Sequence, residues 1–165
     1  MVSGSGSVRQ LHRWKTQRSD RPIHSMGTNL GYKMILTSAA QFIQILHHVD
    51  PIERQRLRDA TATEIIWLEI IEKYPEARRS VTLVRNLPKA AIVKLVMDED
   101  PNVRFDMAMK RCLPPESFLL LATDSDDTVR QRVAYNRKTP REILELLSLD
   151  KSDLVSSRAR AQLNR

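Results

Sequence analysis

The stretch DSDDTVRQRVAYNRKTPREILELLSL, from Asp124 to Leu149, decides the fold because it repeats the stretch before it. That earlier stretch, DEDPNVRFDMAMKRCLPPESFLLLAT, runs from Asp98 to Thr123 and aligns with it at a shift of 26 residues. Residues 72–97 keep part of the same pattern, and residues 150–165 begin another copy. A fixed period of this length with an apolar skeleton is typical of stacked repeat proteins.

Each copy carries the same order of local signals. An acidic turn comes first, and a short helix is expected after it, around Val103–Lys110 and again around Val129–Asn136. A turn that contains proline follows, for instance the capping box Thr139-Pro140-Arg141-Glu142, and then a helix with apolar residues three and four positions apart. One such hairpin cannot bury both of its faces alone. The sequence therefore predicts an all-α fold, an α-solenoid of short helical-hairpin repeats with a period of 26 residues and a cap at residues 150–165.

The region before the clear copies follows the pattern only loosely. Apolar spacing predicts a helix over residues 34–46, and Asp50-Pro51-Ile52-Glu53 has the residues of a helix start. A more apolar helix is expected over residues 64–73, with Trp67 in the core. We interpret residues 46–71 as a degenerate first repeat.

Positive charge is concentrated near the N-terminus of the chain, whose net charge is +7. Residues 1–33 hold six Lys or Arg against Asp20 alone, and the remaining 132 residues hold 21 Lys or Arg against 19 Asp or Glu. We divide the chain into a basic flexible N-terminal arm or linker, residues 1–31, and a helical repeat domain, residues 32–165. Three interpretations of the first segment stay open: a loosely packed extension, a basic arm for nucleic acid or an acidic partner, and a targeting peptide.

The segment VRQRVAYNRKTPREILELLSLD resembles the leucine-rich repeat variant unit. That unit has Val-Arg, a Val-Ala pair, an asparagine, Thr-Pro, a glutamate, paired leucines and an aspartate. The matching residues are Val129, Arg130, Val133, Ala134, Asn136, Thr139, Pro140, Glu142, Leu144, Leu147 and Asp150. The two preceding copies match more weakly, and residues 34–71 resemble only a generic HEAT-like helix pair. The resemblance covers about half of the chain.

This resemblance implies a right-handed superhelix of short helices, some of them 3₁₀, in a cytosolic protein of bacterial type. Some members of the family carry a cysteine-ligated iron–sulfur cluster outside the repeats. Cys112, the one cysteine of the chain, cannot supply such a cluster. The family is a scaffold family, so membership does not name a ligand.

No constellation of residues in the sequence points to catalysis or to a metal. The four histidines all precede the clear copies, and all four glycines lie at or before Gly31. These positions provide no zinc-ligand spacing, no neighbouring Cys–His pair and no glycine-rich phosphate loop. No apolar run approaches the roughly 18 residues of a membrane span. We expect a cytoplasmic protein that is not an enzyme, with no cofactor, no membrane association and no small-molecule substrate.

Two columns of arginine recur at the period of 26 residues. The first column, which follows the acidic turns, consists of Arg78, Arg104 and Arg130. We expect it to form ion pairs between copies with Asp98, Asp100, Asp124 and Asp126. The second column has no acidic residue adjacent in sequence and consists of Arg85, Arg111 and Arg137, with Lys110 and Lys138 beside it. These five are the candidate binding residues, and a structural role remains an equal alternative for the second arginine column.

Our leading hypothesis is that the repeat surface binds another protein, because stacked repeats present an extended surface for that purpose. The alternative is nucleic-acid binding through the basic arm and the arginine columns, with an affinity that falls steeply as salt rises. A third class, an enzyme similar to helical-repeat DNA glycosylases, would need aromatic residues such as Trp67 and Tyr135 to converge with a carboxylate in a groove.

Overall fold

The computed structural model describes residues 33–165, and this part of the chain is helical. It contains ten α-helices and two short 3₁₀ helices, and its extended backbone forms only an isolated bridge between Ile35 and Thr61. The prediction of an all-α fold is confirmed for these residues. The predicted basic arm, residues 1–31, lies outside the part that the structure describes.

The helices are short and closely spaced along the chain. They are α1 (Ala39–Leu46), α2 (Pro51–Arg56), η1 (Leu57–Asp59), α3 (Glu64–Lys73), η2 (Pro75–Ala77), α4 (Arg78–Thr82), α5 (Lys89–Val96), α6 (Pro101–Ala108), α7 (Pro115–Ala122), α8 (Asp127–Tyr135), α9 (Arg141–Leu147) and α10 (Asp153–Leu163). The 3₁₀ helix η1 directly continues α2. The first helix begins later than predicted, because the Ser38 hydroxyl caps it by accepting from the Gln41 N–H at 3.2 Å.

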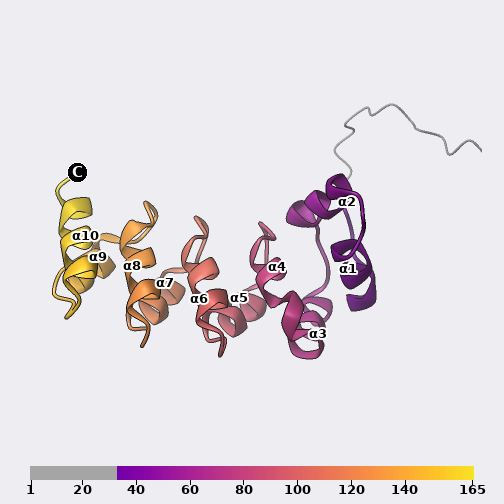
Figure 1. Ribbon diagram of the computed structural model, residues 1–165, viewed down its shortest axis with the longest axis horizontal. Coiled ribbons are helices and arrows are strands. Elements are labelled where there is room, and N and C mark those ends of the chain that lie inside the picture. The colour runs from indigo at the N-terminus through magenta and orange to yellow at the C-terminus, as the bar shows by residue number, and fades with distance from the viewer. Residues whose placement is uncertain (1–32) are drawn as a thin grey trace, which may run out of the picture. The chain divides into compact units, whose positions relative to one another are not determined.

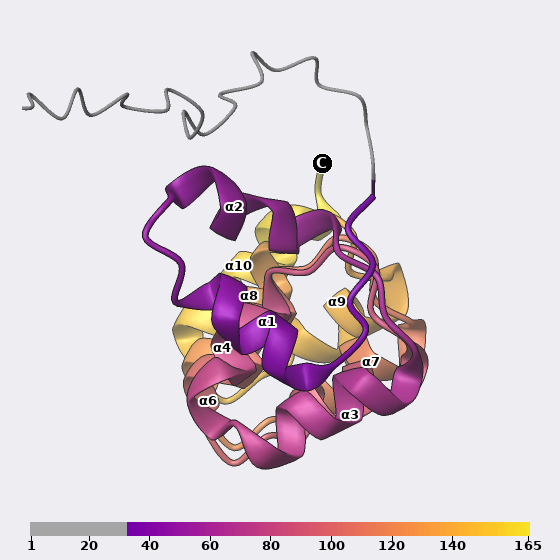
Figure 2. The same cartoon turned by 90° about the vertical axis from the view of Figure 1, so that its right-hand side faces the viewer.

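From α3 onward, the helices form two rows in which alternate helices are neighbours. One row contains α3, α5, α7 and α9, and the other contains α4, α6, α8 and α10. Figure 1 shows the successive hairpins beside one another, and Figure 2, turned by 90°, shows the helices of each row behind one another. Each inner hairpin is therefore covered on both sides by another hairpin.

The fully buried side chains recur at the period seen in the sequence. In the row that begins with α4, one buried column contains Val81, Met107, Val133 and Ala159, and another contains Ala77, Val103, Val129 and Val155. In the other row the buried column contains Leu95, Leu121 and Leu147. At the N-terminal end the rings of Phe42 and Trp67 meet edge to face, with centres 5.8 Å apart. The prediction that Trp67 lies in the core is confirmed.

Aspartate side chains start two helices of the α4 row. Asp100 accepts a hydrogen bond from the Asn102 N–H, and Asp126 accepts one from the Thr128 N–H, both at 2.8 Å. Hydrogen bonds from Asn102 and Thr128 also hold the pKa values of these two carboxyls below their ordinary value. One role of the acidic turns is therefore to cap the N-terminus of the helix that follows.

The capping box predicted from Thr139 to Glu142 is wrong. Pro140 occupies the N-cap of α9, and no side chain hydrogen-bonds to the N-terminal amides there. The Thr139 hydroxyl donates instead to the Val133 carbonyl at 2.7 Å. The Val133 carbonyl near the C-terminus of α8, which also accepts from the Asn136 N–H at 3.0 Å, thus binds the hydroxyl that would otherwise cap α9.

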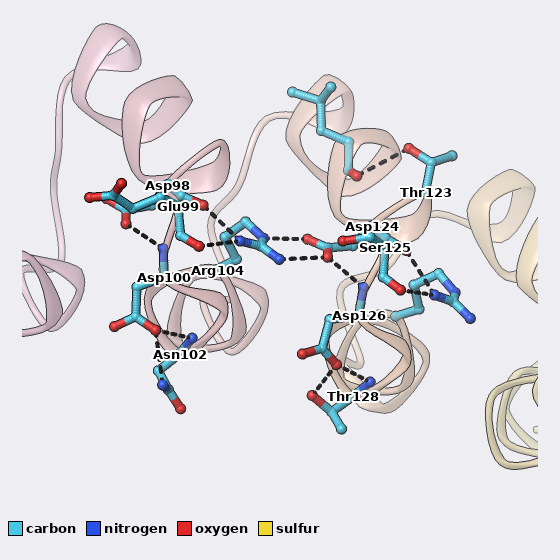
Figure 3. Close-up of polar contacts among 12 residues, drawn as sticks. Asp98, Glu99, Asp100, Asn102, Arg104, Thr123, Asp124, Ser125, Asp126 and Thr128 are labelled. Carbon is cyan, nitrogen blue, oxygen red and sulfur yellow. Dashed lines mark hydrogen bonds and ion pairs between the residues drawn. The ribbon is translucent and has the colours of Figure 1, made fainter.

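The first arginine column joins each hairpin to the next (Figure 3). Arg104 donates to both carboxylate oxygens of Asp124, at 2.7 and 2.9 Å, and to the Asp98 carbonyl at 2.7 Å. Arg130 makes the same contacts one period later, with the Asp150 carboxylate at 2.7 and 3.0 Å and the Asp124 carbonyl at 2.7 Å. The predicted ion pairs between copies are confirmed for Arg78 with Asp98 and for Arg104 with Asp124, whereas Arg130 pairs with Asp150, which was not among the predicted partners.

The partners within the acidic turns differ from the prediction in two respects. Asp100 and Asp126 cap helices instead of pairing with the arginines, because only the first aspartate of each turn faces the neighbouring hairpin (Figure 3). The Arg78 guanidinium lies 3.6 Å from Asp98 and 3.0 Å from Glu99, so it is held less closely than the later two. Ser156 occupies the next position of the column and hydrogen-bonds to the Ser152 carbonyl at 3.1 Å.

Candidate functional site

The five candidate binding residues lie in three equivalent loops, residues 83–88, 109–114 and 135–140; the first two follow α4 and α6, and the third begins with the last residue of α8. The loops contain no acidic residue, and Figure 1 shows them along one edge of the helical rows. The acidic turns follow the helices of the other row, from α5 to α9. We call the three loops the cationic edge.

Three of the candidates are exposed and have no acidic partner in the described part of the chain. No ion pair there includes Arg111, Arg137 or Lys138. Arg85 differs, because its guanidinium lies 2.7 Å from the Asp59 carboxylate. Both of those side chains are largely exposed, so this ion pair is weak and leaves Arg85 accessible. Asp59 lies one period before Arg85, which is why it is not adjacent in sequence.

Lys110 has a structural role that the sequence did not predict. Its ammonium donates to the Val84 carbonyl in the preceding loop and is partly buried. Equivalent contacts recur one and two periods later, where Asn136 donates to the Lys110 carbonyl at 2.7 Å and Gln162 donates to the Asn136 carbonyl at 2.8 Å. The Lys110 side chain therefore belongs to a column of hydrogen bonds between hairpins, and its charge is less available to a partner than that of Arg111.

We expect the Lys110→Gln variant to be more stable than the wild type at neutral pH. Burial lowers the pKa of Lys110 from 10.5 to about 8. Between these values the unfolded chain binds more protons than the folded chain, so wild-type stability rises with pH, by up to about 3 kcal/mol.

Urea unfolding of both proteins, measured from about pH 7 to pH 10.5, tests this expectation. The stability advantage of Lys110→Gln should shrink as pH rises, because glutamine donates to the same carbonyl without a charge to desolvate. An advantage that stays constant across this range would contradict the proposed titration of Lys110.

A column of exposed apolar residues accompanies the arginines. Leu83, Met109 and Tyr135 each precede an arginine of the second column by two residues, and they are 57%, 48% and 46% exposed. The guanidinium of Arg158 lies 4.0 Å from the centre of the Tyr135 ring. This column was not predicted from the sequence, although the shift of 26 residues that aligns the arginines also aligns these three residues.

Two neighbouring hollows open along this side of the helices, with Leu83 lining both. One hollow of about 410 Å³ lies between α2 and α4, and its lining includes Pro51, Arg54, Leu57 and Arg58. The other, of about 530 Å³, lies between the first two loops of the cationic edge, and its lining includes Arg85, Asn86, Asp106, Met109, Lys110, Arg111 and Cys112. Arg54 and Arg58 are additional candidates that the degenerate pattern of residues 46–71 concealed.

The two hollows place apolar side chains beside arginines. Within residues 33–165, no cluster of three or more His, Cys, Asp or Glu side chains is arranged to hold a metal ion. Trp67 is buried in the core, so it offers no stacking surface beside Tyr135. No helix in this part of the chain is long and apolar enough to cross a membrane. Comparisons with models of protein families, with curated proteins and with solved structures gave no match.

Proposed function

We propose that residues 32–165 form a right-handed α-solenoid that is not an enzyme and that binds another protein in the cytoplasm through its cationic edge. The observation that carries this proposal is the pairing, in each loop, of an exposed apolar side chain with an arginine: Leu83 with Arg85, Met109 with Arg111, and Tyr135 with Arg137. Such a surface suits an acidic protein segment that also presents apolar side chains.

The solenoid assignment is supported by contacts that recur from hairpin to hairpin. Residues of the leucine-rich repeat variant pattern have defined contacts: Arg130 binds Asp150, Asn136 binds the preceding loop, and Thr139 binds α8. These contacts give physical roles to the residues on which the resemblance rests. The right-handed sense is part of the proposal and comes from that resemblance.

The apolar column distinguishes a binding role from a purely structural one. Cations at helix C-termini are favourable because they face the negative end of the helix dipole, which explains arginine and lysine after α4, α6 and α8. The dipole gives no reason for a large apolar side chain to stay exposed beside each arginine. Leu83 and Met109 line one hollow together, and neighbouring exposed apolar side chains of this kind are typical of an interaction surface.

Two features favour protein binding over the nucleic-acid alternative: the small net charge of residues 33–165 and the contact of Arg158 with the ring of Tyr135. Residues 33–165 carry 22 Lys or Arg against 19 Asp or Glu, so this part of the chain is close to neutral. Tyr135 is the aromatic residue of the cationic edge, and Arg158 lies over its ring. A nucleic-acid site would combine a stronger positive field with free aromatic faces for stacking.

We expect the double variant Arg111→Ser, Arg137→Ser to bind acidic polypeptide at least about tenfold more weakly than the wild type, because two exposed charges without acidic partners are removed. A fluorescein-labelled random copolymer of Glu and Leu serves as the probe, in anisotropy titrations of the full chain. Arg141→Ser is the matched control, because Arg141 is exposed and pairs with Glu145 on α9, outside the cationic edge.

A labelled mixed-sequence DNA duplex is titrated in parallel at about 50 mM and 200 mM salt. The nucleic-acid alternative would be favoured if the duplex binds more tightly than the copolymer, if this binding is lost at the higher salt, and if the double variant weakens it. If Arg141→Ser weakens binding of the copolymer as much as the double variant does, the cationic edge is not the binding site.

A further inference from the structure

We propose that the two hollows on either side of Leu83 hold two apolar side chains of one extended, acidic peptide segment of the partner protein. This inference rests on the proposed function and specifies the form of the ligand. The hollows occupy successive gaps along one side of the helices, the first between α2 and α4 and the second between the loops after α4 and α6. A single chain that follows the cationic edge would pass over both.

The first hollow combines an apolar base with positive charge. Leu57 is buried beneath it and Leu83 is half-exposed at its wall. Arg54 and Arg58 also line it, and neither forms an ion pair within residues 33–165. No acidic side chain is part of its lining. An apolar ligand side chain would therefore enter with an acidic neighbour beside the two arginines.

The second hollow has the same chemistry. Leu83 and Met109 supply its apolar walls, and Arg111 supplies a charge without an acidic partner in the described part of the chain. Its acidic lining residue, Asp106, is already held by Arg79 at 2.8 Å. A cavity of roughly 150 Å³ can hold a benzene ring. Hollows of about 410 and 530 Å³ are therefore large enough for a leucine or phenylalanine side chain.

The spacing of the helices determines how far apart the two ligand side chains should be. Packed neighbouring helices lie roughly 8–10 Å apart. A polyproline II segment rises about 3.1 Å per residue with three residues per turn, so residues i and i+3 project to the same side about 9 Å apart. In a β-strand, same-side residues i and i+2 are only about 7 Å apart. We therefore expect apolar residues at i and i+3, with acidic residues between and around them.

Asn86 provides a main-chain contact suited to such a ligand. It is exposed at the second hollow, and its side-chain amide has no hydrogen-bond partner among residues 33–165. A polyproline II segment has no internal hydrogen bonds, so its amides and carbonyls are available to a side chain that both donates and accepts. Residues 1–31 of this chain are an unsuitable occupant, because their charge has the same sign as that of the hollows.

The test uses fluorescein-labelled synthetic peptides of equal length and equal negative charge, titrated against the full chain by anisotropy. The panel carries two leucines at i and i+2, at i and i+3 or at i and i+4, with one-leucine and no-leucine versions. The i, i+3 peptide should bind at least about tenfold more tightly than the one-leucine peptide. Leu83→Ser should abolish this difference, because Leu83 lines both hollows, and Met109→Ser should reduce it.

Leu120→Ser is the control, because Leu120 is 42% exposed but lies on α7, away from the cationic edge. If all peptides of the panel bind with equal affinity and Arg111→Ser still lowers that affinity, the two-hollow inference is overturned and the proposed protein binding stands. The same holds if no peptide binds while the Glu–Leu copolymer does. Displacement of the peptides by a DNA duplex with higher affinity than any of them would overturn both proposals.

Discussion

Replacing Arg130 by methionine should lower the free energy of unfolding by about 3–5 kcal/mol, because it leaves the Asp150 carboxylate buried without its counter-charge. The side chains of Arg130 and Asp150 are only 6% and 9% exposed, and they are joined by two hydrogen bonds. The same guanidinium also donates to the Asp124 carbonyl, so the variant loses a link within its own hairpin as well. Urea unfolding at neutral pH, followed by circular dichroism, measures the loss.

Two comparisons separate the buried ion pair from a general effect of removing a charge. Arg141→Met removes an exposed arginine whose partner is Glu145, and it should cost less than about 1 kcal/mol. The double variant Arg130→Met, Asp150→Leu replaces the whole pair by apolar groups and should regain most of the stability. An Arg130→Met cost no greater than that of Arg141→Met would show that the pair does not hold the hairpins together.

The pH dependence of stability gives an independent check on this ion pair. The hydrogen bonds from Arg130 hold the pKa of Asp150 below its ordinary value of 3.8. The stabilisation that Asp150 provides is therefore complete above that value and is lost as pH falls through it toward the lower folded-state pKa. Acid unfolding of the wild type should accordingly be steeper than that of the double variant Arg130→Met, Asp150→Leu.

The sequence predicted the helical class and the first arginine column because both depend on residues that recur at the same position in every copy. Arg104 and Asp124 occupy fixed positions in adjacent copies, so aligning the copies shows a cation near an acidic turn. The alignment does not show which aspartate of the turn faces the arginine. That choice depends on backbone geometry: Asp126 lies where it can cap α8, while Asp124 and Asp150 face the neighbouring hairpin.

The candidate site was predicted less completely, for physical reasons that differ between residues. Lys110 looked like an exposed cation because its acceptor, the Val84 carbonyl, is a main-chain group that no sequence pattern displays. Arg54 and Arg58 were missed because residues 46–71 depart from the period. Met109 could have been found, since it falls in a column with two other large apolar residues, but exposure cannot be read from the apolar pattern alone.

Replacing Asn136 by alanine should lower the free energy of unfolding by about 2–4 kcal/mol, because it leaves main-chain groups unpaired in the interior. The Asn136 amide donates to the carbonyls of Ala108 and Lys110 at 2.8 and 2.7 Å, and its oxygen accepts from the Lys138 N–H at 3.0 Å. The residue is 6% exposed, so water cannot easily replace these contacts. Denaturant unfolding of the variant gives the loss directly.

Gln162→Ala is the matched comparison, because Gln162 occupies the same column but makes one such bond, to the Asn136 carbonyl, and is only partly buried. Its cost should be about 1 kcal/mol. Asn136→Asp keeps the acceptor for Lys138 but sets a negative charge against two carbonyls, so it should be at least as harmful as alanine. If Asn136→Ala and Gln162→Ala lower the free energy of unfolding equally, the two hydrogen bonds of the Asn136 amide stabilise the fold no more than the single bond of Gln162. If Asn136→Ala is the more costly, the contacts that position Arg137 and Lys138 for a partner also hold two hairpins together.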